Sequence, residues 1–197
     1  MNQKKVSIIV PTSNRVKLLK RALESIFSQT YKNWEIIIID NYSDDGTEEY
    51  IKNLNDKRIT YKKFRNHDVI GASRNKGIDC SEGRYLAFLD SDDWWENNKL
   101  EKCIDAINFY KSDIVYHNCY IKGRNVSSRT YARQLKKPVY DDLIRNGNTL
   151  ITSSVVVKKE IIIEAGCFSE ESNICGWEDY DLWIKISKMK KIFFLIP

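Results

Sequence analysis

Short apolar segments alternate with amphipathic stretches through the first half of this chain, and this alternation constrains the fold more than any other feature. Residues 6–10, 34–39 and 85–89 are almost entirely apolar, whereas residues 18–27 carry apolar side chains at helical spacing. Strands that are apolar on both faces must be covered on both faces, and intervening helices provide that cover in parallel sheets. We therefore expect an α/β fold with a mostly parallel central sheet flanked by helices.

The same patterns predict further elements along the chain. Residues 122–138 are polar and basic with little periodicity, which predicts a mobile loop. We expect one domain over 1–197, in which a nucleotide-binding half at 1–92 continues into a mixed half at 93–197 that completes a cleft. Strands are expected at 58–64, 113–116, 149–157 and 192–196, and helices at 50–54, 73–80, 100–107, 159–165 and 180–189.

Composition fits one globular domain and excludes several other classes. The 197 residues are 42% hydrophobic and 30% charged, which argues against disorder. The net charge of +5 comes from scattered Lys and Arg, so nucleic acid is not the expected partner, and phosphorylated ligands or anionic headgroups suit it better. Five cysteines without metal-binding spacing are interpreted as reduced, mostly buried thiols. No apolar run is long enough for a membrane helix or a signal peptide, so we expect a cytoplasmic protein, with peripheral membrane contact left open.

Polar residues follow three of the expected parallel strands at the point where each strand ends. They lie at 11–15, 40–47 and 90–93. Ligands of open α/β sheets bind beyond the carboxyl ends of the strands, so these three segments are expected to surround one cleft.

The third of these segments contains Asp90, Asp92 and Asp93 directly after a buried strand. Carboxylates crowded at such a position favour a bound cation, and an Asp-x-Asp pair offers the oxygen ligands that Mg²⁺ or Mn²⁺ prefers. Helix capping by Asp92 or Asp93 is the alternative interpretation. Zinc is not indicated, because His67 and His117, which we expect on the surface or in loops, accompany no cysteine motif.

Two further positions can contact a nucleotide diphosphate. Residues 71–77 begin a helix whose free N–H groups, together with Arg74, could face phosphate, although a capped helix with exposed bases explains the same residues. Asp40 could accept the N3–H of uracil, or it could be an ordinary turn residue.

Residues 175–183 place an aromatic side chain beside two acids at a predicted helix start. Capping by Glu178 or Asp179 is one interpretation. The other is functional: Trp177 can stack on the apolar face of a sugar, and an adjacent carboxylate can remove a proton from its hydroxyl.

These motifs coincide, in order and spacing, with a known family. The chain resembles the family 2 glycosyltransferases, bacterial inverting enzymes of the GT-A fold that transfer sugars from nucleotide diphosphate donors. The matching residues are 6–12, Asn14, Arg15, Ser25, Ile26, 29–31, 34–40, Ser43, 45–47, Arg74, Asn75, Gly77, Ile78, 83–93, 166–168 and 178–183.

The resemblance implies a GT-A (Rossmann-like), mixed and mostly parallel sheet, and it implies roles for particular residues. Asp179 is implied as the catalytic base, Asp92 as the metal ligand for Mn²⁺ or Mg²⁺, and Asp93 only as a helix cap. Trp177 and Glu178 are weaker candidates for acceptor binding. The donor nucleotide is implied to contact Pro11, Thr12, Asn14, Arg15, Asp40, Arg74, Asp90 and Ser91.

The resemblance also implies a reaction and its partners. Asp179 would deprotonate an acceptor hydroxyl while a metal assists departure of the diphosphate, with inversion at the anomeric carbon. The donor is expected to be a UDP-sugar and the acceptor a saccharide, lipid-linked, in the synthesis of a surface polysaccharide such as O-antigen or capsule. Family members usually continue past Pro197, so we expect a C-terminally truncated acceptor half.

Other classes fit the sequence less well. A nucleotidylyltransferase or a Rossmann dehydrogenase needs a Gly-rich turn after its first strand, and residues 11–15 contain no glycine. A non-catalytic module that binds nucleotide-sugars or carbohydrates remains the alternative from a different class.

Overall fold

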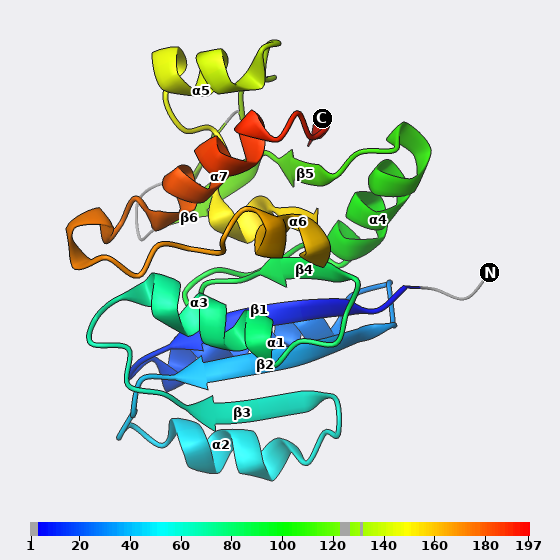
Figure 1. Cartoon of the computed structure of the whole chain (residues 1–197). Helices are drawn as coiled ribbons and strands as arrows, with labels where there is room; N and C mark the ends of the chain where they lie inside the picture. The colour runs from blue at the N-terminus through cyan, green and yellow to red at the C-terminus, as the bar shows by residue number, and fades with distance from the viewer. Residues whose placement is uncertain (1–3, 123–126, 131) are drawn as a thin grey trace.

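A computed structural model describes residues 4–122, 127–130 and 132–197 (Figure 1). Within these residues, seven strands form one sheet in the order β3-β2-β1-β4-β8-β5-β9, and β6 and β7 form a separate hairpin. Only β8 runs antiparallel to its neighbours β4 and β5, so the sheet is mixed and mostly parallel, as expected. The strands are β1 (Val6–Thr12), β2 (Trp34–Asp40), β3 (Ile59–Lys63), β4 (Tyr85–Phe88), β5 (Ile114–His117), β6 (Cys119–Lys122), β7 (Ser127–Thr130), β8 (Val156–Lys158) and β9 (Phe193–Ile196).

Helices cover both faces of the sheet, which explains why its central strands are apolar on both sides. The helices α1 and α4 pack with the cluster that contains Leu23 and Leu100, and the helices α3, α6 and α7 pack with the cluster that contains Phe88 and Trp183. Figure 1 shows α3, α6 and α7 on the near side. The helices are α1 (Val16–Phe27), α2 (Thr47–Leu54), α3 (Ile70–Asp79), α4 (Lys99–Tyr110), α5 (Val139–Asn146), α6 (Lys159–Glu164) and α7 (Glu178–Lys188), with short 3₁₀ turns η1 (Thr152–Ser154) and η2 (Ser172–Ile174).

Strand register brings the candidate residues to one edge of the sheet. Thr12 pairs with Asp40, and Asp40 pairs with Lys63, so β1, β2 and β3 end together. Because β8 runs in the opposite direction, the turn η1 that precedes it lies at the same edge as the end of β4. Residues 152–154 therefore lie beside the carboxylates that follow β4.

The helix α3 approaches the sheet closely at Gly77. A Cβ atom there would lie 2.5 Å from Cγ2 of Ile9, which is closer than real Cβ contacts come. Only glycine allows this approach, and it holds Arg74, almost one turn earlier in the same helix, against the sheet beside Asp90.

Most expected elements are present, with five corrections. The strand expected at 149–157 is confined to β8, because residues 152–154 form the turn η1, in which the N–H of Ser154 donates to the carbonyl of Ile151. The helix α3 begins at Ile70 rather than near Ser73, and α5 was not predicted. The loop expected at 122–138 instead contains β7, which pairs with β6, while residues 123–126 and 131 lie outside the described residues. All five cysteines are free, but only Cys103 is buried, so most of these thiols are not buried as expected.

Candidate active site

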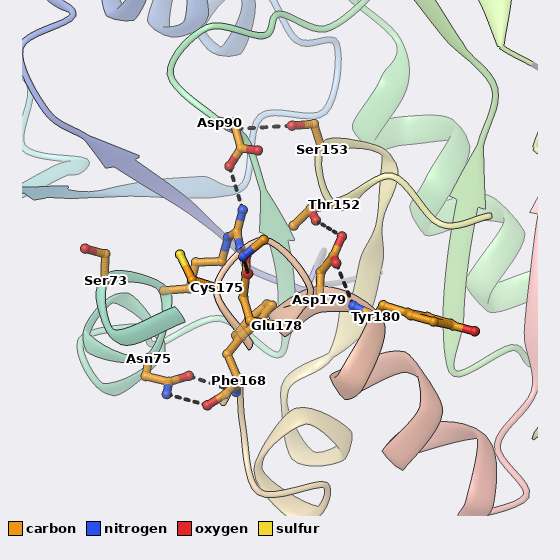
Figure 2. A network of polar contacts seen from close by, with 12 residues as sticks. Ser73, Asn75, Asp90, Thr152, Ser153, Phe168, Cys175, Glu178, Asp179 and Tyr180 are labelled. Atoms are coloured by element: carbon orange, nitrogen blue, oxygen red, sulfur yellow. Dashed lines mark hydrogen bonds and ion pairs between the residues drawn. The ribbon is translucent and has the colours of Figure 1, made fainter. Parts of the chain in front are cut away.

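Arg74 joins two carboxylates at the edge of the sheet. Its buried guanidinium donates from Nη1 to Oε1 of Glu178 at 2.5 Å and from Nη2 to Oδ1 of Asp90 at 2.9 Å (Figure 2). Two carboxylates compensate the desolvation of one buried cation, which fixes α3, the end of β4 and the start of α7 relative to one another. The guanidinium expected to face phosphate is thus engaged with carboxylates in this structure.

Asp179 lies at the first turn of α7, next to this network. The hydroxyl of Thr152 donates to Oδ2 of Asp179 at 2.7 Å, and the backbone N–H of Tyr180 donates to Oδ1 at 2.6 Å (Figure 2). Burial raises the pKa of Asp179 above its usual value, although the Thr152 hydroxyl and the charge of Arg74 partly oppose that rise. A carboxylate that is held in one orientation and has a raised pKa is suited to accept a proton.

The two residues before Asp179 differ in accessibility. Glu178 is buried, and its second oxygen accepts from the N–H of Gly176 at 2.7 Å. Trp177 is 63% exposed. Of the two candidates for acceptor binding, only Trp177 therefore presents its side chain to a ligand.

The three aspartates after β4 have three different environments. Asp90 is partly exposed and pairs with Arg74, and its N–H donates to the hydroxyl of Ser153 at 3.2 Å. Asp92 is 48% exposed and pairs with Arg15 at 2.7 Å. Burial raises the pKa of Asp93. The capping role expected for Asp93 is wrong, because α4 begins at Lys99, six residues later.

The donor set at this edge fits a hard divalent cation only in part. Asp90 and Asp92 could supply oxygen ligands, and Mg²⁺ and Mn²⁺ are commonly held by one or two carboxylates together with substrate phosphates and water. The ion pair of Asp92 with Arg15 is exposed, worth roughly 0–1 kcal/mol, and is easily exchanged for a cation. Among the described residues, no group of three or more His, Cys, Asp or Glu side chains is arranged to hold a metal by itself.

The ends of β1 and β2 form the other side of the site. Asp40 is fully buried, and its carboxylate accepts from the N–H and hydroxyl of Ser43 and from the hydroxyl of Tyr61. The hydroxyl oxygen of Thr12 is buried, and none of the described residues bonds to it. Of the remaining candidates, Pro11 lies within β1, Arg15 immediately precedes α1, and Ser91 is buried after β4. Asn14 has a positive φ of 50°, and its side-chain oxygen accepts from the N–H of Asp44.

Sequence reasoning missed the residues that contact the candidate aspartates. Thr152 and Ser153 lie in a β-branched stretch that resembled a strand, so no local signal marked them. Tyr61 lies on the neighbouring strand β3, and its contact with Asp40 depends on strand order. Residues 152–153 reach this edge because β8 runs antiparallel to β4 and β5, and the sequence pattern does not reveal that direction.

No helix in the described ranges is both long and apolar enough to cross a membrane.

Comparisons with known proteins agree on one family. Residues 7–165 match the family described as Glycosyl transferase family 2. The chain is 34% identical over 196 residues to an uncharacterized glycosyltransferase of Rickettsia conorii, and it spans 32% of that protein's length. It is 33% identical over 190 residues to the UDP-Glc:alpha-D-GlcNAc-diphosphoundecaprenol beta-1,3-glucosyltransferase WfgD of Escherichia coli, with 95% of this chain and 71% of that protein covered.

Solved structures share the fold at low sequence identity. Residues 1–349 of Staphylococcus aureus TarS, in complex with UDP-GlcNAc, superpose with a TM-score of 0.74 at 20% identity, covering 98% of this chain and 56% of TarS 1–349. The mannosyltransferase PcManGT of Pyrobaculum calidifontis, in complex with GDP-Man and Mn²⁺, gives a TM-score of 0.75 at 19% identity, covering 99% and 55%. The fold is thus of the GT-A type, and the chain belongs to glycosyl transferase family 2.

Proposed function

We propose that this chain transfers a hexose from a nucleotide diphosphate donor, a UDP-sugar, to a hydroxyl of a saccharide acceptor. The observation that carries the proposal is the Asp179 carboxylate, which burial keeps at a raised pKa and Thr152 holds in place beside Asp90 and Arg74. The relative WfgD is named for a UDP-Glc donor, and TarS was solved with UDP-GlcNAc, which supports UDP as the carrier.

Asp179 acts as the general base in this proposal. It takes the proton of the acceptor hydroxyl while that oxygen attacks the anomeric carbon and the diphosphate leaves with the electron pair of the broken C–O bond. A single in-line displacement of this kind inverts the anomeric configuration, and a positioned base contributes about 10²–10⁴ in rate.

The donor lies along the ends of β1, β2 and β4. The buried carboxylate of Asp40 and the hydroxyl of Thr12, which has no hydrogen-bond partner among the described residues, lie where the nucleoside binds, with Pro11, Asn14 and Arg15 beside them. Asp90 and Ser91 lie at the ribose and diphosphate, and the buried Arg74 is paired with Asp90. In this proposal, residues 1–92 form the donor half of the domain and 93–197 the acceptor half.

Asp92, together with the donor diphosphate, would hold a divalent cation, Mn²⁺ or Mg²⁺. When bound, it supplies charge neutralisation of the leaving diphosphate. PcManGT was solved with Mn²⁺, and the exposed, exchangeable carboxylate of Asp92 is consistent with the same use here.

The acceptor is a saccharide carried on a lipid diphosphate, used at the cytoplasmic face of the membrane to build a surface polysaccharide. The name of WfgD specifies a GlcNAc-diphosphoundecaprenol acceptor, which supports this class. The exposed ring of Trp177, two residues before Asp179, offers a stacking surface for its sugar.

One experiment separates transfer from simple binding. The chain is mixed with UDP-Glc, UDP-GlcNAc or GDP-Man, with and without Mn²⁺, and thermal stability and nucleotide release are measured with a GlcNAc-diphospholipid acceptor. We expect a UDP-sugar to raise the Tm in the presence of Mn²⁺ and to release UDP only when acceptor is added. Binding without any transfer or hydrolysis would instead favour the non-catalytic module.

A further inference from the structure

A cavity of about 440 Å³ lies beside the candidate site, against α4 rather than α7. It is lined by the start of α4, the ends of β5 and β9, the strand β6 and the segment that follows Asp92. The volume is within the ~300–1,000 Å³ of typical small-molecule sites and far exceeds the ~30 Å³ of one water.

Lys99 lines this cavity, and its ammonium group has no hydrogen-bond acceptor among the described residues. The residue is only 5% exposed. It lies 3.9 Å from the centre of the Trp95 ring, a favourable contact that satisfies none of its three N–H donors. Burial lowers the pKa of Lys99 to about 8, as expected for an ammonium without a carboxylate partner.

His117 offers the opposite hydrogen-bonding capacity in the same cavity. Its Nδ1 atom lies 2.8 Å from the carbonyl oxygen of Asn118, and its Nε2 atom is buried without a partner in the described part of the chain. Burial, helped by the charge of Lys99, lowers the pKa of His117 to about 4, so the ring is neutral at pH 7. Nδ1 then carries the proton and donates to Asn118, which leaves Nε2 as an acceptor. His117 is therefore not the surface or loop residue expected from the sequence.

Water and hydroxyl groups can both satisfy these two atoms, and a ligand does so in place of water when it brings a hydroxyl group. Its oxygen accepts from the Lys99 ammonium, and a hydroxyl proton donates to Nε2 of His117. A carboxylate or a fully ionised phosphate accepts from Lys99 but has no proton for His117. Adjacent hydroxyls on a ring are typical of sugars, and the exposed ring of Tyr120 on the rim of the cavity is a surface on which a sugar can lie. The guanidinium of Arg21 already covers one face of the neighbouring Trp94 ring, 3.9 Å from its centre.

We propose that this cavity binds a sugar ring of the acceptor saccharide, with Lys99 donating to its hydroxyls and His117 accepting from them. Its assignment to the acceptor rests on the proposed function. The segment around η1 connects the two sites: Ile151 and Ser153 line the cavity, while Thr152 between them contacts Asp179. A saccharide held there therefore lies across one short segment from the proposed base.

The test uses N-acetylglucosamine and methyl β-glucoside as probes, without donor. Binding is followed by NMR through the indole N–H signals of Trp94 and Trp95. We expect both signals to shift with added sugar, and Lys99→Met to weaken binding roughly tenfold through loss of a charge-assisted hydrogen bond. Since Met keeps the length of the side chain and removes a buried charge, the variant should fold, which its Tm checks. His117→Phe should weaken binding as well, by removing the acceptor.

Lys102→Met is the matched control, because Lys102 is an exposed lysine of α4 on the rim of the same cavity. It should leave sugar affinity unchanged. Inorganic phosphate and pyrophosphate test the alternative of an anion site. The proposal is overturned if either anion displaces the sugar and Lys102→Met weakens binding as much as Lys99→Met, or if Lys99→Met has no effect.

Transfer assays separate this proposal from the proposed function. Asp179→Asn should bind the sugar probes normally, since it lies outside the cavity. If the parent chain transfers sugar and Lys99→Met leaves the acceptor KM unchanged, the acceptor cavity is wrong while the function stands. If sugar binding depends on Lys99 and His117 but no donor is ever used, the cavity is a saccharide site and the proposed transfer is wrong.

Discussion

The hydroxyl of Thr152 donates a 2.7 Å hydrogen bond to Oδ2 of Asp179, joining the turn before β8 to the first turn of α7. Residues 27 positions apart thereby fix the orientation of the proposed base. A hydrogen bond to the ionised carboxylate favours that form, so Thr152 opposes the rise in the pKa of Asp179 that burial causes. We regard Thr152 as a positioning residue for Asp179.

Thr152→Val should move the acid limb of the pH–rate profile to higher pH. The variant keeps the shape of the side chain and removes the donor, so the pKa of Asp179 rises further and the ionised base is formed only at higher pH. Thr152→Ser, which keeps the hydroxyl, should restore the parent profile. The measurement is kcat/KM against pH, and an unshifted limb in the valine variant would remove Thr152 from this role.

Asp179→Asn should be at least as stable as the parent at pH 7, by up to roughly 1 kcal/mol. The folded-state pKa of Asp179 lies above its unfolded value, so this group favours folding below the unfolded pKa and loses that contribution as pH rises through the folded pKa. The stability gain of the variant should therefore be largest at neutral pH and shrink toward pH 4. Urea unfolding of both proteins at several pH values checks it, and a variant much less stable at pH 7 would contradict the burial argument.

Arg74→Met should destabilise the fold by about 3–5 kcal/mol, because it leaves the buried carboxylate of Glu178 without its cation. Adding Glu178→Met should recover a large part of this loss, since no buried charge then remains at that contact. Asp90 is partly exposed and should matter less. The four proteins of the cycle are compared by urea unfolding. A single Arg74→Met variant as stable as the parent would show that the ion pair does not hold α3 to α7.

Asp92→Asn should remove the Mn²⁺ dependence of UDP binding and weaken it at least about tenfold in the presence of Mn²⁺. Calorimetric titration of UDP with and without Mn²⁺ measures both effects. Asp105→Asn, an exposed aspartate of α4, is the control and should behave as the parent. If Asp92→Asn keeps the full response to Mn²⁺, the cation is held elsewhere or is not used.

Local pattern was sufficient for most of the sheet. The strands β1, β2 and β4 are continuous apolar runs, and the helices between them repeat apolar residues at helical spacing, so fold class and the cluster of strand ends could be predicted. The helix α5 was not predicted, because only Asp142 and Leu143 of its eight residues are buried and the helix therefore lacks a clear apolar face. The hairpin of β6 and β7 was not predicted because three of the four residues of β6 are exposed and the sequence of β7, residues 127–130, is polar.

Contacts between distant segments could not be predicted. The pairing of Arg74 with Glu178 spans 104 positions, and neither side chain carries a local sign that it will be buried. The position of Thr152 depends on β8 entering the sheet in the reverse direction between β4 and β5. Sequence patterns identify the strand ends that are followed by candidate functional residues, whereas the order and direction of the strands determine which of these side chains come into contact.

The role of Asp179 as the base is tested most directly by comparing Asp179→Asn with Asp181→Asn in sugar transfer and donor binding. Asp181 lies on the same helix but pairs with Lys185, so its loss should leave both quantities close to those of the parent. We predict that Asp179→Asn binds the UDP-sugar with unchanged affinity and transfers it about 10²–10⁴ times more slowly. Transfer at the parental rate by Asp179→Asn would contradict the assignment of Asp179 as the base.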